Sequence, residues 1–184
     1  MTCTRCLLQR CLCAEIPTIA TRTRVVIVRH YSEIHRSSNS GRLAHLALPN
    51  SEIIDHGGFG GLAKLPPLDG AWLLFPEGEP MTAMPADRPP PTMLVALDAT
   101  WSQARRMFRK LAGLRGLPIL RLPEPARPLP ARMREAPSPD RVSTIEAIAG
   151  ALRLVEGSES AEPLEALFAL AVQRAAQSGR NIVK

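Results

Sequence analysis

The chain has 184 residues, of which 45% are hydrophobic and 22% charged, the composition of one soluble globular domain with a hydrophobic core. No apolar run approaches the ~20 residues that a membrane helix needs, and the N-terminal residues MTCTRCLLQRCLC lack the apolar segment of a secretion signal, so we expect a cytoplasmic protein that does not associate with membranes. The net charge of +6 comes mainly from two basic segments, 1–50 and 101–142; on one face they would form a surface for phosphate groups, and the alternative is an arginine-rich surface that only aids solubility.

The first element is a cluster that holds all the cysteines of the chain: Cys3, Cys6, Cys11 and Cys13. Disulfides are disfavoured in a reducing compartment, whereas four thiolates this close together can surround one tetrahedral Zn²⁺. A redox cluster or free thiols are the alternatives. Four protein ligands leave no open position, so the zinc would be structural. We expect a cysteine-rich zinc knuckle over residues 1–20, followed by a second domain over 21–184.

Five short runs rich in apolar and β-branched residues follow and are predicted as strands: 22–30, 51–55, 71–80 (cut off by Pro76), 92–98 and 116–123. Most are apolar throughout, which is typical of strands buried on both faces of a parallel sheet. Helices are expected before Pro49, from Trp101 to about Leu111, over 142–157 and from near Pro163. Strands that alternate with helices predict a single α/β domain with a mostly parallel sheet.

Polar residues collect where two of these strands end. His30, Glu33, His35, Arg36 and Asn39 follow the first strand; they either hydrogen-bond a substrate or form a solvated loop, and metal binding is disfavoured by their spacing.

Asp98 ends the fourth strand beside a capping box of Thr100 and Gln103 that opens the next helix. The helix end favours the ionised acid, which could act as a base or fix a donor, or simply be a common N-terminal helix acid. Trp101 either stacks on a base or fills the core.

Two glycine- or proline-rich turns are further candidates for ligand-binding loops. GGFGGLA (57–63) contains a G-x-G-x-x-A pattern, but two prolines follow where a dinucleotide fingerprint requires a helix, so a flexible loop is predicted. LFPEGEP (74–80) follows the third strand, and such loops can line a pocket at the carboxyl ends of a sheet; a plain turn is the alternative. The proline- and arginine-rich segment 123–140 is predicted as a long loop.

Five motifs, read in order, resemble the DTW-domain family of tRNA-uridine aminocarboxypropyltransferases. The resemblance spans residues 3 to about 155, and Tyr31 stands where the family usually has proline. The matching residues are the cysteine cluster with Ile16 and Pro17; His30, Glu33, Arg36 and Asn39; Leu74, Phe75 and Pro76; Asp98, Ala99, Thr100 and Trp101; and Ser143, Thr144, Ile145, Glu146 and Ala147.

The resemblance implies a fold related to the SPOUT methyltransferases: an α/β domain, helices on both faces of the sheet, and a C-terminal trefoil knot, preceded here by the zinc knuckle. Residues 21–184 would be this catalytic DTW domain. S-adenosylmethionine would bind in the knot through backbone loops over 74–77, 98–101 and from Leu120 to Ser143. The residues expected to bind this co-substrate are Leu74, Phe75, Pro76, Glu77, Leu97, Thr100, Trp101, Leu120, Ser143 and Thr144.

The implied reaction transfers the 3-amino-3-carboxypropyl group from S-adenosylmethionine to N3 of a tRNA uridine and releases methylthioadenosine. Asp98 would be the catalytic residue, as a base or an orienter; because a helix end lowers its pKa, positioning is its larger expected role. The alternatives are a SPOUT-type RNA methyltransferase and a non-catalytic zinc-knuckle RNA-binding protein; a monomer and a homodimer are both open. The residues expected to bind RNA are Arg22, Arg24, His30, Glu33, Arg36, Asn39, Arg105, Arg106 and Arg109.

Overall fold

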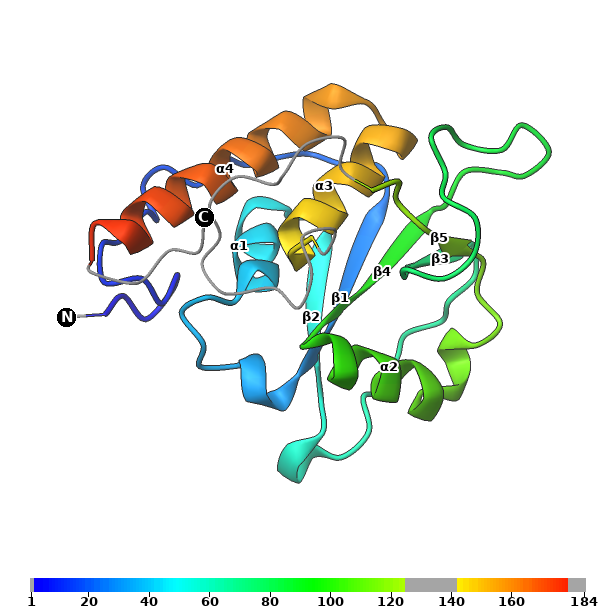
Figure 1. Cartoon of the computed structure of the whole chain (residues 1–184), viewed down its shortest axis with the longest axis horizontal. Helices are drawn as coiled ribbons and strands as arrows, with labels where there is room; N and C mark the ends of the chain where they lie inside the picture. Colours follow the sequence, from blue (N-terminus) through cyan, green and yellow to red (C-terminus); the bar gives the residue numbers. More distant parts are fainter. Residues whose placement is uncertain (1, 125–141, 179–184) are drawn as a thin grey trace.

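The computed structural model describes residues 2–124 and 142–178, and its centre is a five-stranded parallel sheet (Figure 1). The strands lie in the order β2-β1-β4-β3-β5, and every pairing is parallel. They are β1 (Arg24–His30), β2 (Ser51–His56), β3 (Ala71–Leu74), β4 (Met93–Asp98) and β5 (Ile119–Leu120). The predicted α/β domain with a parallel sheet is therefore confirmed.

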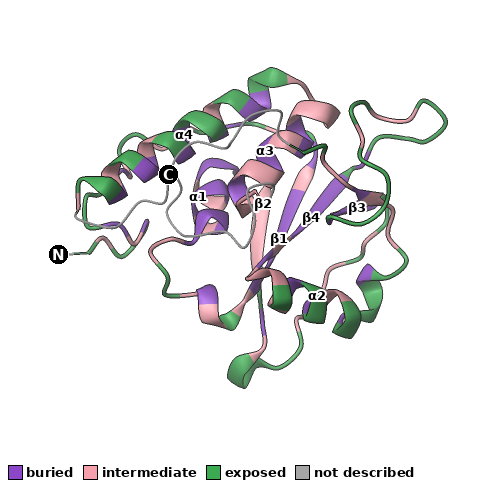
Figure 2. Ribbon diagram, viewed as in Figure 1, coloured by how far each residue is buried: buried purple, intermediate pink, exposed green. Residues whose placement is uncertain are grey.

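Four helices cover the two faces of this sheet. They are α1 (Ser40–Ala47), α2 (Trp101–Lys110), α3 (Thr144–Val155) and α4 (Ser158–Ala176), with short 3₁₀ turns η1 (Tyr31–Glu33), η2 (Gly58–Gly60) and η3 (Ala112–Leu114). Side chains alternate along a strand, so Val25 and Ile27 pack with α1, α3 and α4, whereas Val26 and Val28 pack with α2 and η3. The strands are buried between these two layers (Figure 2).

The ends of several elements differ from the sequence prediction. α4 begins at Ser158 and not near Pro163, because Gly157 has a φ of 105° and donates its N–H to the carbonyls of Leu152 and Arg153. This glycine ends α3 and turns the chain at once into α4. β3 stops at Leu74, before Pro76, and β5 has 2 residues, so the predicted strands 71–80 and 116–123 are too long.

The N-terminal segment packs on the same side of the sheet as α1 and α4. Cys6, Leu8 and Leu12 are buried in the same hydrophobic cluster as Leu43 of α1 and Leu164 of α4. The segment and the sheet thus share one core, and a domain boundary after residue 20 stays a prediction. The predicted trefoil knot would involve the connection from β5 to α3, whose residues 125–141 lie outside the described parts of the chain. Over those parts, no helix combines the length and the hydrophobicity needed to cross a membrane.

Candidate active site at the carboxyl edge of the sheet

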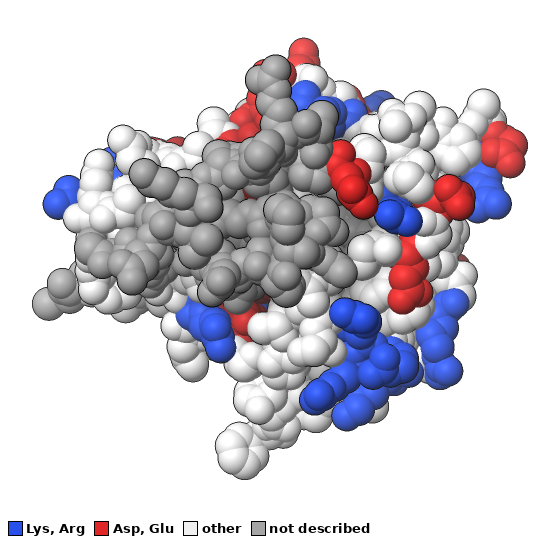
Figure 3. All heavy atoms as spheres, in the orientation of Figure 1, with Lys and Arg blue, Asp and Glu red and all other residues white. Residues whose placement is uncertain are grey.

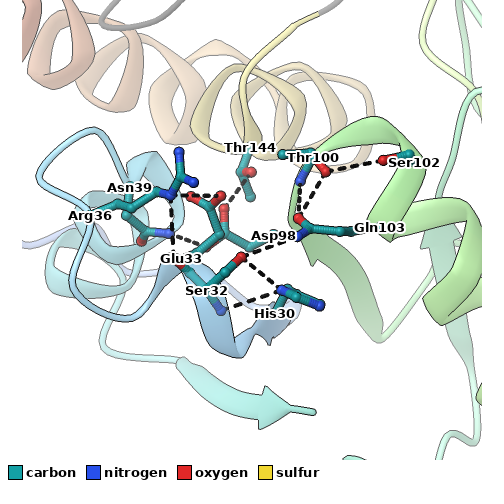
Figure 4. A network of polar contacts seen from close by, with 10 residues as sticks. All are labelled: His30, Ser32, Glu33, Arg36, Asn39, Asp98, Thr100, Ser102, Gln103 and Thr144. Atoms are coloured by element: carbon teal, nitrogen blue, oxygen red, sulfur yellow. Dashed lines mark hydrogen bonds and ion pairs between the residues drawn. The ribbon is translucent and has the colours of Figure 1, made fainter. Parts of the chain in front are cut away.

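A buried carboxylate joins three elements where β4 ends. Asp98 is 0% exposed. The Nδ2 amide of Asn39 donates to its Oδ2, and the Oγ1 hydroxyl of Thr144 donates to its Oδ1 at 2.7 Å (Figure 4). Asn39 caps α1 and Thr144 is the first residue of α3. One carboxylate therefore ties the end of β4 to the beginnings of two helices that are distant in sequence.

Close approach of α1 to this carboxylate depends on Gly41. A Cβ atom on Gly41 would lie 2.7 Å from Cγ of Asp98 and 2.9 and 3.0 Å from its two oxygens, closer than atoms at van der Waals contact. The side chain of Asn39 also accepts the backbone N–H of Arg42 at 2.7 Å. The first turn of α1 is thus built against Asp98 with no room for a side chain at position 41.

A second polar chain starts at the end of β1 and reaches α2. Ser32 donates its backbone N–H to Nδ1 of His30 at 3.3 Å, and its hydroxyl lies 2.8 Å from the same atom. Nε2 of Gln103 donates to the hydroxyl of Ser32 at 3.2 Å, while Oε1 of Gln103 accepts the N–H of Thr100 at 3.0 Å. Nδ1 of His30 is therefore an acceptor, and its neutral ring carries the proton on Nε2.

Burial, more than the neighbouring charges, favours the neutral ring of His30. Burial lowers the pKa of His30; Glu33 opposes this shift and Arg106 adds to it. Glu33 is 0% exposed, and its carboxylate lies 3.6 Å from Nε of Arg36. The polar residues predicted after β1 thus form an ordered corner and not a solvated loop, although the side chains of His35 and Arg36 are exposed.

Sequence reasoning missed a row of charges beside Asp98. Arg29 is the register partner of Asp98 on one side and of Asp55 on the other, and it donates to both oxygens of Asp55, at 2.7 and 3.1 Å. Arg29 is 8% exposed. This row could have been predicted from the charged residues at the ends of the apolar strands, because neighbouring parallel strands bring their carboxyl ends to the same edge of a sheet.

The residues predicted to bind S-adenosylmethionine divide into two groups. Leu74 and Leu120 are buried register partners, and Phe75 is stacked on Phe108 with ring centroids 4.7 Å apart. Leu97 is partly buried in the α2-side cluster. The side chains of Leu74, Phe75 and Leu120 are thus buried, whereas that of Leu97 is partly exposed.

The other predicted binding residues are partly or fully exposed. Pro76 and Glu77 lie on the surface beyond β3, and Thr100, Trp101, Ser143 and Thr144 are half-buried at helix beginnings. Trp101 is half-buried and belongs to neither hydrophobic cluster of the described residues, and its role stays a prediction. Most of the predicted stretch from Leu120 to Ser143 lies outside the described residues.

The predicted RNA-binding arginines lie at opposite ends of the sheet. Arg105, Arg106 and Arg109, with Lys110, are exposed on α2 and form a basic surface at the lower right of Figure 3. Arg24, in contrast, begins β1 and pairs with Glu52 at 3.0 Å. The length of β1 separates Arg22 and Arg24 from the carboxyl edge by about 20 Å. The structure therefore does not bring these two arginines to the site.

The four cysteines come together in a geometry that fits a metal ion. Their sulfur atoms all lie within 4.8 Å of one another, with Cys3 to Cys13 at 3.7 Å and Cys6 to Cys11 at 4.0 Å. Zinc bonds of ~2.3 Å in a tetrahedron place sulfur atoms about 3.8 Å apart, whereas a disulfide needs about 2 Å. The backbone N–H groups of Cys6 and Arg5 lower the pKa of Cys3 to about 6, whereas burial and the neighbouring thiols raise the pKa of Cys13 to about 12. Cys3 is therefore the thiol of this pair that more readily supplies a thiolate to a metal.

The backbone of this cluster is constrained as well. Among the described residues, Leu7 is the single non-glycine residue with a positive φ, 61°, and it follows Cys6 directly. Cys3 and Leu8 close the turn, since the N–H of Cys3 donates to the carbonyl of Leu8 at 3.0 Å. The N–H of Cys13 donates to the sulfur of Cys11 at 3.4 Å. The four cysteines can therefore hold one metal ion.

Comparison with known proteins agrees with the motifs. A family model described as a DTW domain matches residues 1–176, which is nearly the whole chain and includes every motif above. The resemblance drawn from the sequence is thus confirmed. No solved structure matches the chain.

Proposed function

The chain belongs to the DTW-domain family, and on that premise we propose that it modifies tRNA by transferring the 3-amino-3-carboxypropyl group of S-adenosylmethionine to N3 of a uridine. One observation carries this proposal. Asn39, Asp98 and Thr144 come from three separate family motifs, and their side chains meet at one buried carboxylate. Convergence of motif residues on one point, at the sheet edge where α/β domains bind ligands, supports an active site there.

Three segments at this edge would hold S-adenosylmethionine. They follow β3 (residues 74–77), follow β4 (98–101) and open α3 (143–144), and the bond from Thr144 to Asp98 joins the last two. The sulfonium of the bound molecule makes its adjacent carbons electrophilic, and the orientation imposed by these segments would decide that the aminocarboxypropyl carbon reacts and the methyl does not. Most of these residues are half-buried or exposed at the end of the sheet, which fits this task.

Asp98 would act by positioning. Both of its oxygens accept hydrogen bonds from side chains of the protein, and no part of the residue is exposed. A general base must reach the proton that it removes, and this carboxylate is enclosed. Asp98 would instead fix the beginnings of α1 and α3 around the reacting groups.

His30 would contribute as a neutral donor. With Nδ1 occupied as an acceptor by Ser32, the proton on Nε2 is the one available to a ligand. Loss of the N3 proton of uridine to solvent water spreads negative charge onto the neighbouring carbonyl oxygens, and a donor to one of them favours that loss. The lowered pKa of His30 keeps the ring neutral at pH 7.

The finer features of the fold belong to the same proposal. β5 lies at the sheet edge, and α3 packs over β4 and β3. The proposed SPOUT-type trefoil knot would fall between these two elements, on residues 125–141, which lie outside the described parts of the chain. The cysteine cluster would hold a structural zinc ion, and its reduced thiols fit the cytoplasm, where the tRNA partner is found.

The experiment is incubation of the full-length protein with an unmodified tRNA transcript and S-adenosylmethionine. We expect methylthioadenosine in the small-molecule fraction and, after digestion of the tRNA, a uridine heavier by one aminocarboxypropyl group. S-adenosylhomocysteine in place of methylthioadenosine would identify a methyltransferase. Tight tRNA binding with neither product, and no heat of binding for S-adenosylmethionine, would identify a non-catalytic RNA-binding protein.

A further inference from the structure

Exposed large hydrophobic side chains of the described residues gather at one corner of the molecule. They are Tyr31 (50% exposed), Phe59 (115%) and Leu62 (60%). Tyr31 follows β1, and Phe59 and Leu62 follow β2, its parallel neighbour. The ring of Tyr31 lies over the glycines that lead to Phe59: Cβ atoms on Gly57 and Gly58 would be 3.0 and 3.1 Å from it. Tyr31 and the loop that carries Phe59 therefore share one surface at the carboxyl edge of the sheet.

The loop that carries Phe59 has a defined conformation. Gly57, Gly58 and Gly61 have φ values of 88°, 62° and 69°, which side chains rarely adopt. The N–H of Gly57 donates to the carbonyl of Gly61 at 2.6 Å, and the N–H of Ala63 donates to Nδ1 of His56 at 3.3 Å. The loop closes on itself and presents Phe59 at its tip with almost no contact to the protein.

Positive charge borders this apolar corner. Gln103 of α2 donates to the hydroxyl of Ser32, the residue after Tyr31, at 3.2 Å, so α2 begins beside the turn that carries Tyr31. Burial lowers the pKa of His30 and of His56, and Arg106 and Lys110, respectively, act in the same direction, whereas Glu33 opposes the shift of His30. In Figure 3 the basic surface of α2 lies above and to the right of the projection at the bottom of the view. The nearby acid Asp55 is already paired with Arg29.

We propose that Phe59, supported by Tyr31, is a stacking platform for an unpaired tRNA base next to the target uridine, and that the basic face of α2 holds the adjoining phosphates. The inference rests on the proposed function and extends it to the mode of substrate binding. Aromatic rings beside basic side chains are the chemistry that recognises single-stranded RNA. One phenylalanine and one leucine give too little apolar area to anchor a protein on a membrane.

Binding of an unmodified tRNA transcript, without S-adenosylmethionine, tests the platform. Phe59→Ala and Phe59→Leu should each weaken the affinity about ten-fold at fixed salt, and Phe59→Trp should keep or improve it. Leu62→Ala, at an exposed non-aromatic position of the same loop, is the matched control and should stay within about two-fold. Phe59 is fully exposed, so all variants should melt at the temperature of the wild type.

Three results would overturn the inference. One is unchanged tRNA affinity in Phe59→Ala. Another is full affinity in Phe59→Leu, which would show a general apolar contact. The third is a Phe59-dependent loss of sedimentation with phosphatidylserine vesicles, or of self-association on a sizing column, while tRNA binding is unaffected. Because binding is measured without the co-substrate, absence of methylthioadenosine from the wild type would refute the proposed reaction and leave the platform to be judged on affinity alone.

Discussion

Replacing Gly41 by alanine should destabilise the protein, although the same change usually stabilises a helix. Alanine in a helix gains up to ~1 kcal/mol over glycine. Here the new Cβ would lie 2.7–3.0 Å from three atoms of the Asp98 carboxyl group. Overpacking costs about 1–3 kcal/mol, and a displaced carboxylate weakens bonds from Asn39 and Thr144 that are worth about 1.5–3 kcal/mol each. We expect a net loss of about 2–4 kcal/mol.

That loss corresponds to a fall in melting temperature of about 5–15 °C for a chain of this size, measured by calorimetry or circular dichroism. Gly150→Ala in α3 is the matched control. Its Cβ would lie 2.9 Å from Cδ1 of Leu122, but a half-buried leucine can rotate away, so the change should stay within about 1 kcal/mol. If Gly41→Ala melted like the wild type and kept its transferase activity, α1 would not be fixed on Asp98 as inferred.

Three further predictions concern Asp98, the cysteines and the histidines. Asp98→Asn keeps the shape but replaces a charged acceptor of two bonds by an amide, so turnover should be lost while calorimetry still detects S-adenosylmethionine binding; full turnover would remove Asp98 from the mechanism. Purified protein should contain about one zinc ion, and a chelator should lower its melting temperature, because the cluster shares the core with α1 and α4; less than about half an equivalent without chelator would count against the site. Burial lowers the pKa of His30, His45 and His56 below the ordinary 6.5, so just below pH 6.5 the unfolded chain binds more protons than the folded protein. The free energy of unfolding should therefore be highest above pH 6.5 and should fall as the pH drops toward the pKa values of the folded protein. Urea midpoints that are equal at about pH 7 and pH 5.5 would contradict this.

The type and order of the main elements could be predicted because each has a local signal. Continuous apolar runs such as 93–98 indicated buried parallel strands, and the pairs Thr100–Gln103 and Ser143–Glu146 marked the starts of α2 and α3 within two residues. The start of α4 was missed because Gly157 is both the end of one helix and the turn into the next, and a proline at position 163 is the stronger local signal. The strand order β2-β1-β4-β3-β5 depends on contacts between distant segments and has no local signal.

The site could be predicted in part for the same reason. Asp98 was found because an acid at the end of an apolar strand marks the carboxyl edge. The same rule, applied to all strands, would have selected Arg29 and Asp55 and rejected Arg24, which begins β1. Gly41 could not be found in this way, because its importance comes from a close approach that only the folded chain shows.

The surroundings of Asp98 explain why a carboxylate is stable in a place with no contact to water. Burying an isolated carboxylate costs many kcal/mol, and hydrogen bonds and helix dipoles offset that cost. Asn39 and Thr144 each donate a hydrogen bond to the carboxylate. These two residues stand at the beginnings of α1 and α3, where the helix dipole favours negative charge. All of these partners are absent in the unfolded chain. The buried carboxylate is therefore stabilised only when α1 and α3 have both packed against β4. The sheet edge that is proposed to bind the substrates thus forms in the same folding step as the hydrophobic core beneath it.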